Sequence, residues 1–161
     1  MSEKDASSII ADFQFVSYKV DEIKFKVTQT LRVLQCKDMV DQEQINLQLA
    51  IKQPSRYIRE NQPTIYIGGL KIKVKLVDKD DKRKTIASGE FGISGLFKKH
   101  HEIPADQEEY MVKTTIPAIL LSYLRASITT TIANAGFGST ILPLINISNL
   151  VSKMNIQILD K

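Results

Sequence analysis

The histidines and the cysteine of this chain are the side chains best suited to metal binding or nucleophilic chemistry, and they are few. His100 and His101 are the only histidines. They are adjacent, and neither has the i, i+4 partner or the matching carboxylate cluster that would complete a metal site. Cys36 is the only cysteine, so we expect no internal disulfide, no cysteine-based metal centre and a reducing, cytoplasmic setting. These residues predict no metal site.

The serine and glycine patterns do not build a catalytic or phosphate-binding turn either. Ser88 and Ser94 each precede a glycine, but neither lies in the Gly-x-Ser-x-Gly elbow that presents a nucleophile. The pair Gly68-Gly69 stands before a strand, whereas a phosphate-binding turn opens a helix. We therefore predict that the protein is not an enzyme and uses no cofactor.

A stripe of lysines is the most regular polar pattern in the chain. Lys71, Lys73 and Lys75 alternate with apolar residues, so they share one face of a strand. They can form the solvated face of a sheet, or, with Lys24 and Lys26, a surface that steers an acidic partner or a phosphate backbone. We favour the solvated face. Nucleic acid is disfavoured because no aromatic residue interleaves with these lysines to stack bases.

Length and composition predict one domain over residues 1–161, with residues 1–11 flexible. The chain has 161 residues, 43% hydrophobic and 25% charged, with a net charge of +4. Its start lacks the layout of a secretory signal. The most apolar stretch, Ile116 to Ile147, contains Arg125 and is interrupted by glycine and proline, so we expect no stable membrane insertion.

The first hundred residues follow the period of two that is typical of half-buried antiparallel strands. Alternation covers 23–27, 45–51, 70–76 and the glycine-containing run 89–96. Residues 77–84, rich in Asp and Lys, predict the loop of a hairpin that joins the third and fourth strands. Pro54 and Pro63 bracket residues 55–62, where we expect a loop or sheet edge and a connection that crosses the sheet.

The period changes to that of a helix beyond Phe97. Apolar residues recur at helical spacing from Ile116 to Ala135, with Thr115 available as a cap and Pro117 in the first turn. Gly136 suits the left-handed position after a helix. A second helix is predicted from Ser148 or Asn149 to the end of the chain.

The apolar segment from Phe137 to Leu144 has two interpretations. It can cover the core between the two helices, which is the usual fate of such a run. Alternatively, it can form one wall of an exposed hydrophobic groove, because a large apolar patch rimmed by charge often marks a protein-binding surface. The groove residues would then be Phe91, Ile93, Phe97, Tyr123, Leu124, Phe137, Ile141, Leu142 and Leu144.

Two ordered motifs in the second half resemble the SecB family of export chaperones. The strand GEFGISGL over 89–96 has the family's Gly-x-Phe-x-Ile-x-Gly form, and the helix PAILLSYLRASI over 117–128 has its Pro-x-Ile-Leu-x-x-Tyr-x-Arg-x-x-Ile form. Residues 143–147, Pro-Leu-Ile-Asn-Ile, are similar to the family's Pro-Val-Asn-Phe with one extra residue. Ser122 and Leu121 depart from the proline and the aromatic residue that are usual in this helix.

The resemblance implies an α+β fold with a four-stranded antiparallel sheet and two helices packed on one face. It implies a homo-oligomer, a dimer of dimers, that holds unfolded or precursor polypeptides in apolar grooves without ATP, in protein export. The groove interpretation above is the one that the resemblance favours.

One departure from the family concerns the sheet face that docks the translocation motor SecA. That face carries carboxylates in export members, whereas the calculated pI of this chain is about 9.1. The docking position would fall on a charged face formed by Lys71, Lys73, Lys75, Lys82, Arg83 and Lys84. SecA is therefore an open partner. The alternatives are a SecB-like chaperone dedicated to one client, such as an antitoxin, and a basic interaction or nucleic-acid-binding module.

Overall fold

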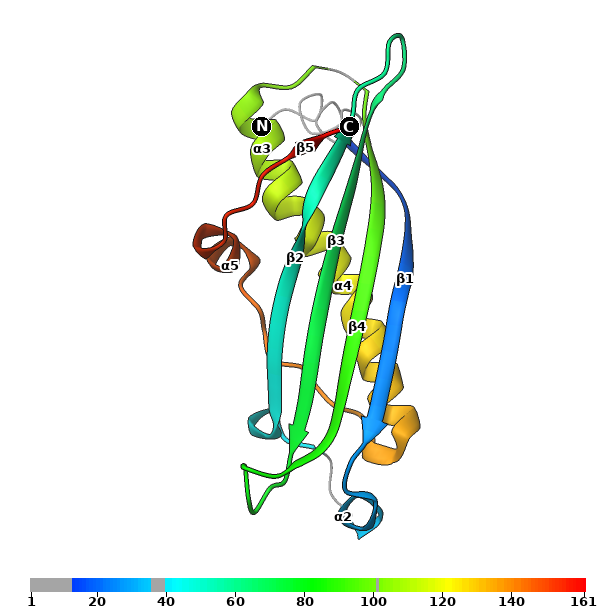
Figure 1. Cartoon of the computed structure of the whole chain (residues 1–161), viewed down its shortest axis with the longest axis vertical. Coiled ribbons are helices and arrows are strands. Elements are labelled where there is room, and N and C mark those ends of the chain that lie inside the picture. Colours follow the sequence, from blue (N-terminus) through cyan, green and yellow to red (C-terminus); the bar gives the residue numbers. More distant parts are fainter. Residues whose placement is uncertain (1–12, 36–39, 101) are drawn as a thin grey trace, which may run out of the picture.

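The computed structural model describes residues 13–35, 40–100 and 102–161, and within them one long helix lies across one face of a twisted sheet (Figure 1). The sheet has the strand order β1-β4-β3-β2-β5. Its strands are β1 Phe13–Val27, β2 Ile45–Tyr57, β3 Thr64–Val77, β4 Thr85–Lys99 and β5 Leu159–Asp160. The four long strands pair antiparallel, and β5 pairs parallel with β2 through Ser55 and Arg56 only. The α+β class is confirmed, but the described sheet has five strands where four were predicted, and a helix at Thr30–Gln35 (α2) is present in addition to the two predicted helices.

Strand β1 pairs with β4 although the two are far apart in sequence, so the connection that crosses over lies between β1 and β2. It contains α2 (Thr30–Gln35) and the short turn η1 (Gln42–Gln44). The crossing predicted at residues 55–62 is wrong. There β2 continues to Tyr57 and then turns directly into β3. The strand tolerates Pro54 because this residue lies in the register shift after Lys52, where no ladder hydrogen bond is required of it. The predicted hairpin loop between β3 and β4 is confirmed.

The long helix begins eleven residues earlier than predicted. It runs through α3 (Ala105–Tyr110), η2 (Met111–Thr115), α4 (Ile116–Ile132) and η3 (Ala133–Phe137). Thr115 is helical and makes no side-chain cap, so its predicted capping role is wrong. Pro117 cannot donate to the preceding turn, and the wide π turn of η2 just before it accommodates the proline inside a continuous helix. Gly136 has φ of 98°, as predicted for the residue that ends the regular helix.

The end of the chain is not a helix to its last residue. Helix α5 covers Ile147–Lys153, and its first turn is capped by the Asn146 side chain, which accepts a hydrogen bond from the Asn149 amide at 3.0 Å. An extended stretch then leads to β5 beside β2. The Arg56 side chain holds this strand by donating hydrogen bonds to the Asp160 carboxylate. The predicted helix to the end of the chain did not include this interaction.

The core lies between the sheet and the long helix. On the helix, an i, i+4 series of fully buried side chains faces the sheet: Ile116, Leu120, Leu124, Ile128 and Ile132. By length and composition the helix from Ala105 to Phe137 would be long enough to cross a membrane, but this stripe is buried against β3 and β4, as in the core helix of a globular protein.

Candidate polypeptide-binding surfaces

The structure divides the nine predicted groove residues into two groups. Six are buried in the core: Phe91, Ile93, Phe97, Leu124, Phe137 and Leu142. The three on β4 project toward the long helix, and the Phe137 ring packs edge-on against Phe25 with 6.3 Å between ring centroids. In this conformation these six side chains fill the core and do not line an open groove. The cause is the long helix, which covers the very face of β4 on which they lie.

Tyr123 belongs to an aromatic cluster at the open edge of the sheet. Its ring lies 4.3 Å from that of Tyr18 and 5.4 Å from that of Phe15, between centroids. Tyr18 is 43% exposed and Tyr123 38%. Phe15, Tyr18 and Tyr123 form what we call the edge cluster. Sequence reasoning missed its two β1 members.

A register shift in β1 creates the edge cluster. Phe15 pairs with Phe97 and Tyr18 with Gly95, and the irregularity between Phe15 and Ser17 inserts one residue. Without that residue, Phe15 and Tyr18 would point to opposite faces, because their separation of three is odd. The bulge puts both rings on the helix side.

The residues after the long helix return along it and are fastened by Arg125. Its guanidinium donates to the backbone oxygens of Leu142 and Pro143, each at 2.9 Å. We call residues 138–146 the return segment. Leu142 points inward, whereas Ile141 and Leu144 are 72% and 94% exposed. Two of the predicted groove residues thus lie at the surface of this segment.

A groove of about 550 Å³ runs between the long helix and the end of the return segment. We call it the helix groove. Aliphatic and aromatic side chains line it from both sides, among them Tyr110, Ile119, Leu121, Ile145 and Ile147. Tyr123 and Arg125 are two positions apart, which places them about 160° apart around the helix. The edge cluster and the return segment therefore flank the helix on opposite sides, with the helix groove alongside the return segment.

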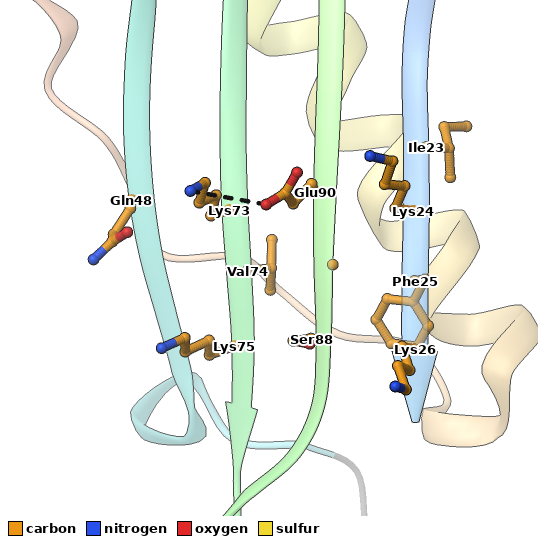
Figure 2. A pocket seen from close by; sticks show the side chains of 11 residues that line it. Ile23, Lys24, Phe25, Lys26, Gln48, Lys73, Val74, Lys75, Ser88 and Glu90 are labelled. Atoms are coloured by element: carbon orange, nitrogen blue, oxygen red, sulfur yellow. Dashed lines mark ion pairs between the residues drawn. The ribbon is translucent and has the colours of Figure 1, made fainter. Parts of the chain in front are cut away.

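The lysine stripe lies on the face of the sheet away from the helix, as Figure 2 shows for Lys73 and Lys75. Part of it is neutralised. Lys71 Nζ lies 3.2 Å from Glu22 and 3.3 Å from Glu90, and Lys73 Nζ lies 3.8 Å from Glu90. Hydrogen bonds to Glu22 and then to Glu90 raise the pKa of Lys71 above its usual value. Lys71 is therefore the least available cation of the stripe.

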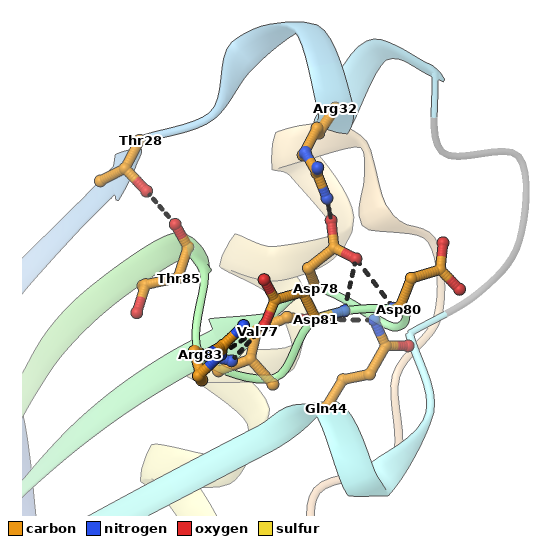
Figure 3. A network of polar contacts seen from close by, with 9 residues as sticks. All are labelled: Thr28, Arg32, Gln44, Val77, Asp78, Asp80, Asp81, Arg83 and Thr85. Carbon is orange, nitrogen blue, oxygen red and sulfur yellow. Dashed lines mark hydrogen bonds and ion pairs between the residues drawn. The ribbon is translucent and has the colours of Figure 1, made fainter.

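Lys82, Arg83 and Lys84 lie apart from the stripe, at the tip of the β3–β4 hairpin. Asp78 organises this loop by accepting hydrogen bonds from the amides of Asp80 (2.8 Å) and Asp81 (3.2 Å). Its other oxygen accepts a hydrogen bond from Arg32 of α2, which joins the loop to the crossover connection (Figure 3). This hydrogen bond from Arg32 is the main reason that the pKa of Asp78 is lowered. The six predicted docking residues thus come from two parts of the fold, strand β3 and the loop between β3 and β4.

An ionic cluster joins four elements of the fold, and its Lys99 and Glu108 side chains are buried. Glu108 of α3 accepts hydrogen bonds from Lys99 of β4, at 2.7 Å, and from Arg56 of β2. Arg56 also binds both carboxylate oxygens of Asp160 in β5. Burial would raise the pKa of Glu108, but the hydrogen bonds from Lys99 and Arg56 outweigh it and the pKa is lowered. All four charges are paired, as a structural cluster requires.

In the parts of the chain that the structure describes, no three His, Cys, Asp or Glu residues are grouped as they would be to hold a metal ion. His100 lies 3.1 Å from the amide oxygen of Gln14, across the β1–β4 pair. His101 and Cys36 fall outside the described residues.

Comparisons with known proteins agree with this fold. A family model described as preprotein translocase subunit SecB matches residues 7–157. Among solved structures, the chain is similar to the SecB-like chaperone Rv1957 of Mycobacterium tuberculosis, which was solved in complex with a ChAD peptide from the Rv1956 HigA1 antitoxin. The TM-score is 0.59 at 12% identity, covering 89% of this chain and 98% of that one. No curated protein matches. Because the family match spans nearly the whole sequence and the structural likeness supports the same fold, the chain belongs to the SecB family.

Proposed function

We propose that this SecB-family protein is an ATP-independent holdase that binds non-native polypeptides through apolar surfaces flanking α4. The observation that carries the proposal is the exposure of large apolar side chains on both sides of one helix: Tyr18 and Tyr123 at the edge cluster, and Ile141 and Leu144 on the return segment. Clusters of exposed apolar side chains often mark protein-binding sites.

The binding free energy comes from apolar burial. An unfolded segment that covers these side chains gains about 25 cal/mol per Å² of apolar surface removed from water, less the cost of ordering the segment. Neither the burial of apolar surface nor the ordering of the segment requires nucleotide. Because the surface offers aromatic and aliphatic contacts and few fixed polar partners, selectivity among apolar segments is loose.

An aggregation assay tests this proposal. A chemically unfolded test protein is diluted into buffer of moderate ionic strength with a stoichiometric amount of the purified chain and no nucleotide, and light scattering is followed. We expect suppression of aggregation that persists when salt is added, because apolar capture is not screened. Absence of suppression, or its loss as salt rises, contradicts the proposal.

Surface variants separate the two sides of the helix. The double change Tyr18→Ser with Tyr123→Ser removes the edge cluster, and Ile141→Ser with Leu144→Ser removes the exposed return segment. We expect each pair to weaken suppression. Ile58→Ser, at an exposed apolar position in the β2–β3 turn, is the matched control and leaves it unchanged.

A chaperone dedicated to one client, such as an antitoxin, is a second candidate. The basic outer face of the sheet favours it, because lysines occupy the face on which export members dock SecA through carboxylates, and a similar structure contains an antitoxin peptide. A panel of unrelated unfolded proteins distinguishes the two. A general holdase suppresses aggregation of most of them, whereas a dedicated chaperone suppresses few.

We also propose that the chain assembles into a homo-oligomer, a dimer of dimers, in the cytoplasm. Strand β1 supports this proposal, because none of the described strands pairs with its outer edge and its 15 residues include the exposed Val16 and Tyr18. Light scattering coupled to size-exclusion chromatography measures the mass against the 18.2 kDa chain. A mass of one chain at all concentrations contradicts this proposal.

A further inference from the structure

The outer face of the sheet contains a hollow of about 660 Å³, and four of the eleven residues that line it are lysines (Figure 2). We call it the basic hollow. It lies on the side opposite the long helix, so it is separate from the apolar surfaces proposed to hold clients. We propose that the basic hollow binds an extended acidic polypeptide segment, one with Asp or Glu at alternate positions.

The charges of the basic hollow are unbalanced. Lys24, Lys26, Lys73 and Lys75 line it, and Glu90 is the carboxylate among the lining residues. Glu90 is shared between Lys73 and Lys71, and Lys24 pairs with Glu22 at 3.3 Å. No carboxylate of the described residues forms an ion pair with Lys26 or Lys75, so within the described part of the chain their charges are uncompensated at this end of the sheet.

The strand register places the two uncompensated lysines in one row. Lys26 of β1 and Lys75 of β3 both lie opposite Ser88 of β4. With strands about 4.8 Å apart, their backbones are separated by about 10 Å across a small hydroxyl side chain. Two flexible ammonium groups can thus approach one anion above Ser88, and the serine hydroxyl can donate a hydrogen bond to the same anion.

The next row has the same geometry. Lys24 and Lys73 flank Glu90, which lies opposite both. Along each strand, successive outward side chains are about 6.6 Å apart, and an extended peptide presents its own alternate side chains at the same interval. An acidic segment that lies along β4 therefore brings one carboxylate to each row. Glu90 opposes it in the second row.

The lining favours a polypeptide over a nucleic acid. Single-stranded nucleic acid is held by bases that stack on aromatic rings. Phe25 is the aromatic residue at the basic hollow, and its ring packs against Phe137 on the helix side of the sheet. The hollow thus offers charged groups and the Ser88 hydroxyl but no ring for stacking.

Fluorescence anisotropy tests the proposal with a labelled ten-residue peptide of alternating Glu and Ser. The comparison ligands are the Gln-Ser peptide of equal length and a labelled dT20 oligonucleotide. For the intact chain at low salt we expect saturable binding of the Glu-Ser peptide, weakened as salt rises, and no binding of the Gln-Ser peptide. Lys26→Gln with Lys75→Gln reduces the affinity about tenfold, as the loss of two charge pairs predicts.

Two further variants make the test specific. Glu90→Gln removes the opposing carboxylate and raises the affinity severalfold. Lys98→Gln with Lys153→Gln removes the same net charge at the other end of β4 and on α5. We expect this control to leave the affinity unchanged, apart from the small decrease that any loss of positive charge causes at low salt. The proposal is overturned if the Glu-Ser peptide does not bind, if both lysine pairs weaken it equally, or if dT20 binds through Lys26 and Lys75 while the peptide does not.

Discussion

Ile116 of α4 packs directly on the backbone of Gly68 in β3, and its side chain occupies the space that a side chain at position 68 would need. A Cβ atom at Gly68 would overlap Ile116 Cγ2, and one at Gly95 in β4 would lie 2.6 Å from Leu120 Cδ2. Two neighbouring strands thus present bare backbone where successive turns of the helix cross them. These two glycines explain how the long helix approaches the sheet so closely.

We expect Gly68→Ala to destabilise the fold by about 1–3 kcal/mol, because the added methyl group overpacks a rigid contact between helix and sheet. Urea unfolding followed by circular dichroism measures the change. In a background of Ile116→Ala the same substitution should cost less, since the overlapping methyl group is gone, and this coupling identifies the contact. Equal costs in both backgrounds would show that the strain arises elsewhere.

Glu108→Gln should cost about 3–5 kcal/mol of stability, because it leaves Lys99 buried without its negative partner and weakens the hold on Arg56. The matched control is Glu109→Gln, which removes an exposed pair with Lys113 on the same helix and should cost less than about 0.5 kcal/mol. Unfolding of both variants in urea is compared with that of the unchanged chain. A small effect at Glu108 would mean that the cluster contributes little to folding.

The same carboxylate predicts an acid-sensitive part of the stability. The pKa of Glu108 lies below its ordinary value of 4.5 in the folded chain, so the stabilisation is fully present above that value and is lost as pH falls through the folded pKa. The difference in stability between the unchanged chain and Glu108→Gln should therefore stay constant from neutral pH down to about 4.5 and shrink as the pH falls further below that value. Urea titrations across this range measure it, and a difference that is independent of pH would contradict the assignment.

The strands were predictable because alternation reports on a half-buried sheet, but their faces were not fully predictable. In β1 the residues on the helix side of the sheet are Phe13 and Phe15, then Tyr18 and Val20, then Ile23, Phe25 and Val27, although Tyr18 and Ile23 are exposed there. The spacing between these short runs is three, so no single period of two connects them. An alternating run that resumes after an odd gap is the sequence signal of a bulge, and it would have located the edge cluster.

The candidate site was only partly predictable because residue type does not report what covers a residue. Phe91 and Leu144 are both large and apolar, yet Phe91 is beneath α4 and Leu144 is in water. The helix that covers Phe91 starts at Ala105. Its first turns were not predicted because Glu108 and Lys113 interrupt the apolar stripe and because a proline such as Pro117 is typical of the first turn of a helix. Tertiary pairing of Glu108 with Lys99 and Arg56, invisible in the local sequence, stabilises that first part.

Arg125 anchors the return segment, and its loss should loosen that segment without unfolding the core. Arg125→Met keeps the length of the side chain but removes both hydrogen bonds to the Leu142 and Pro143 carbonyls, which should cost about 1–3 kcal/mol. Hydrogen exchange read by mass spectrometry should then show faster exchange over the return segment, residues 138–146, and unchanged protection in β3.

Arg125→Lys separates charge from geometry in the same experiment. Lysine keeps the positive charge but lacks the planar fork that reaches two carbonyls at once, so we expect exchange in the return segment between that of the unchanged chain and that of Arg125→Met. Arg59→Met, at an exposed position in the β2–β3 turn, is the control and should leave the exchange of the segment unchanged. If Arg125→Met exchanges like the control, packing of Leu142 alone holds the segment, and the exposure of Ile141 and Leu144 does not depend on Arg125.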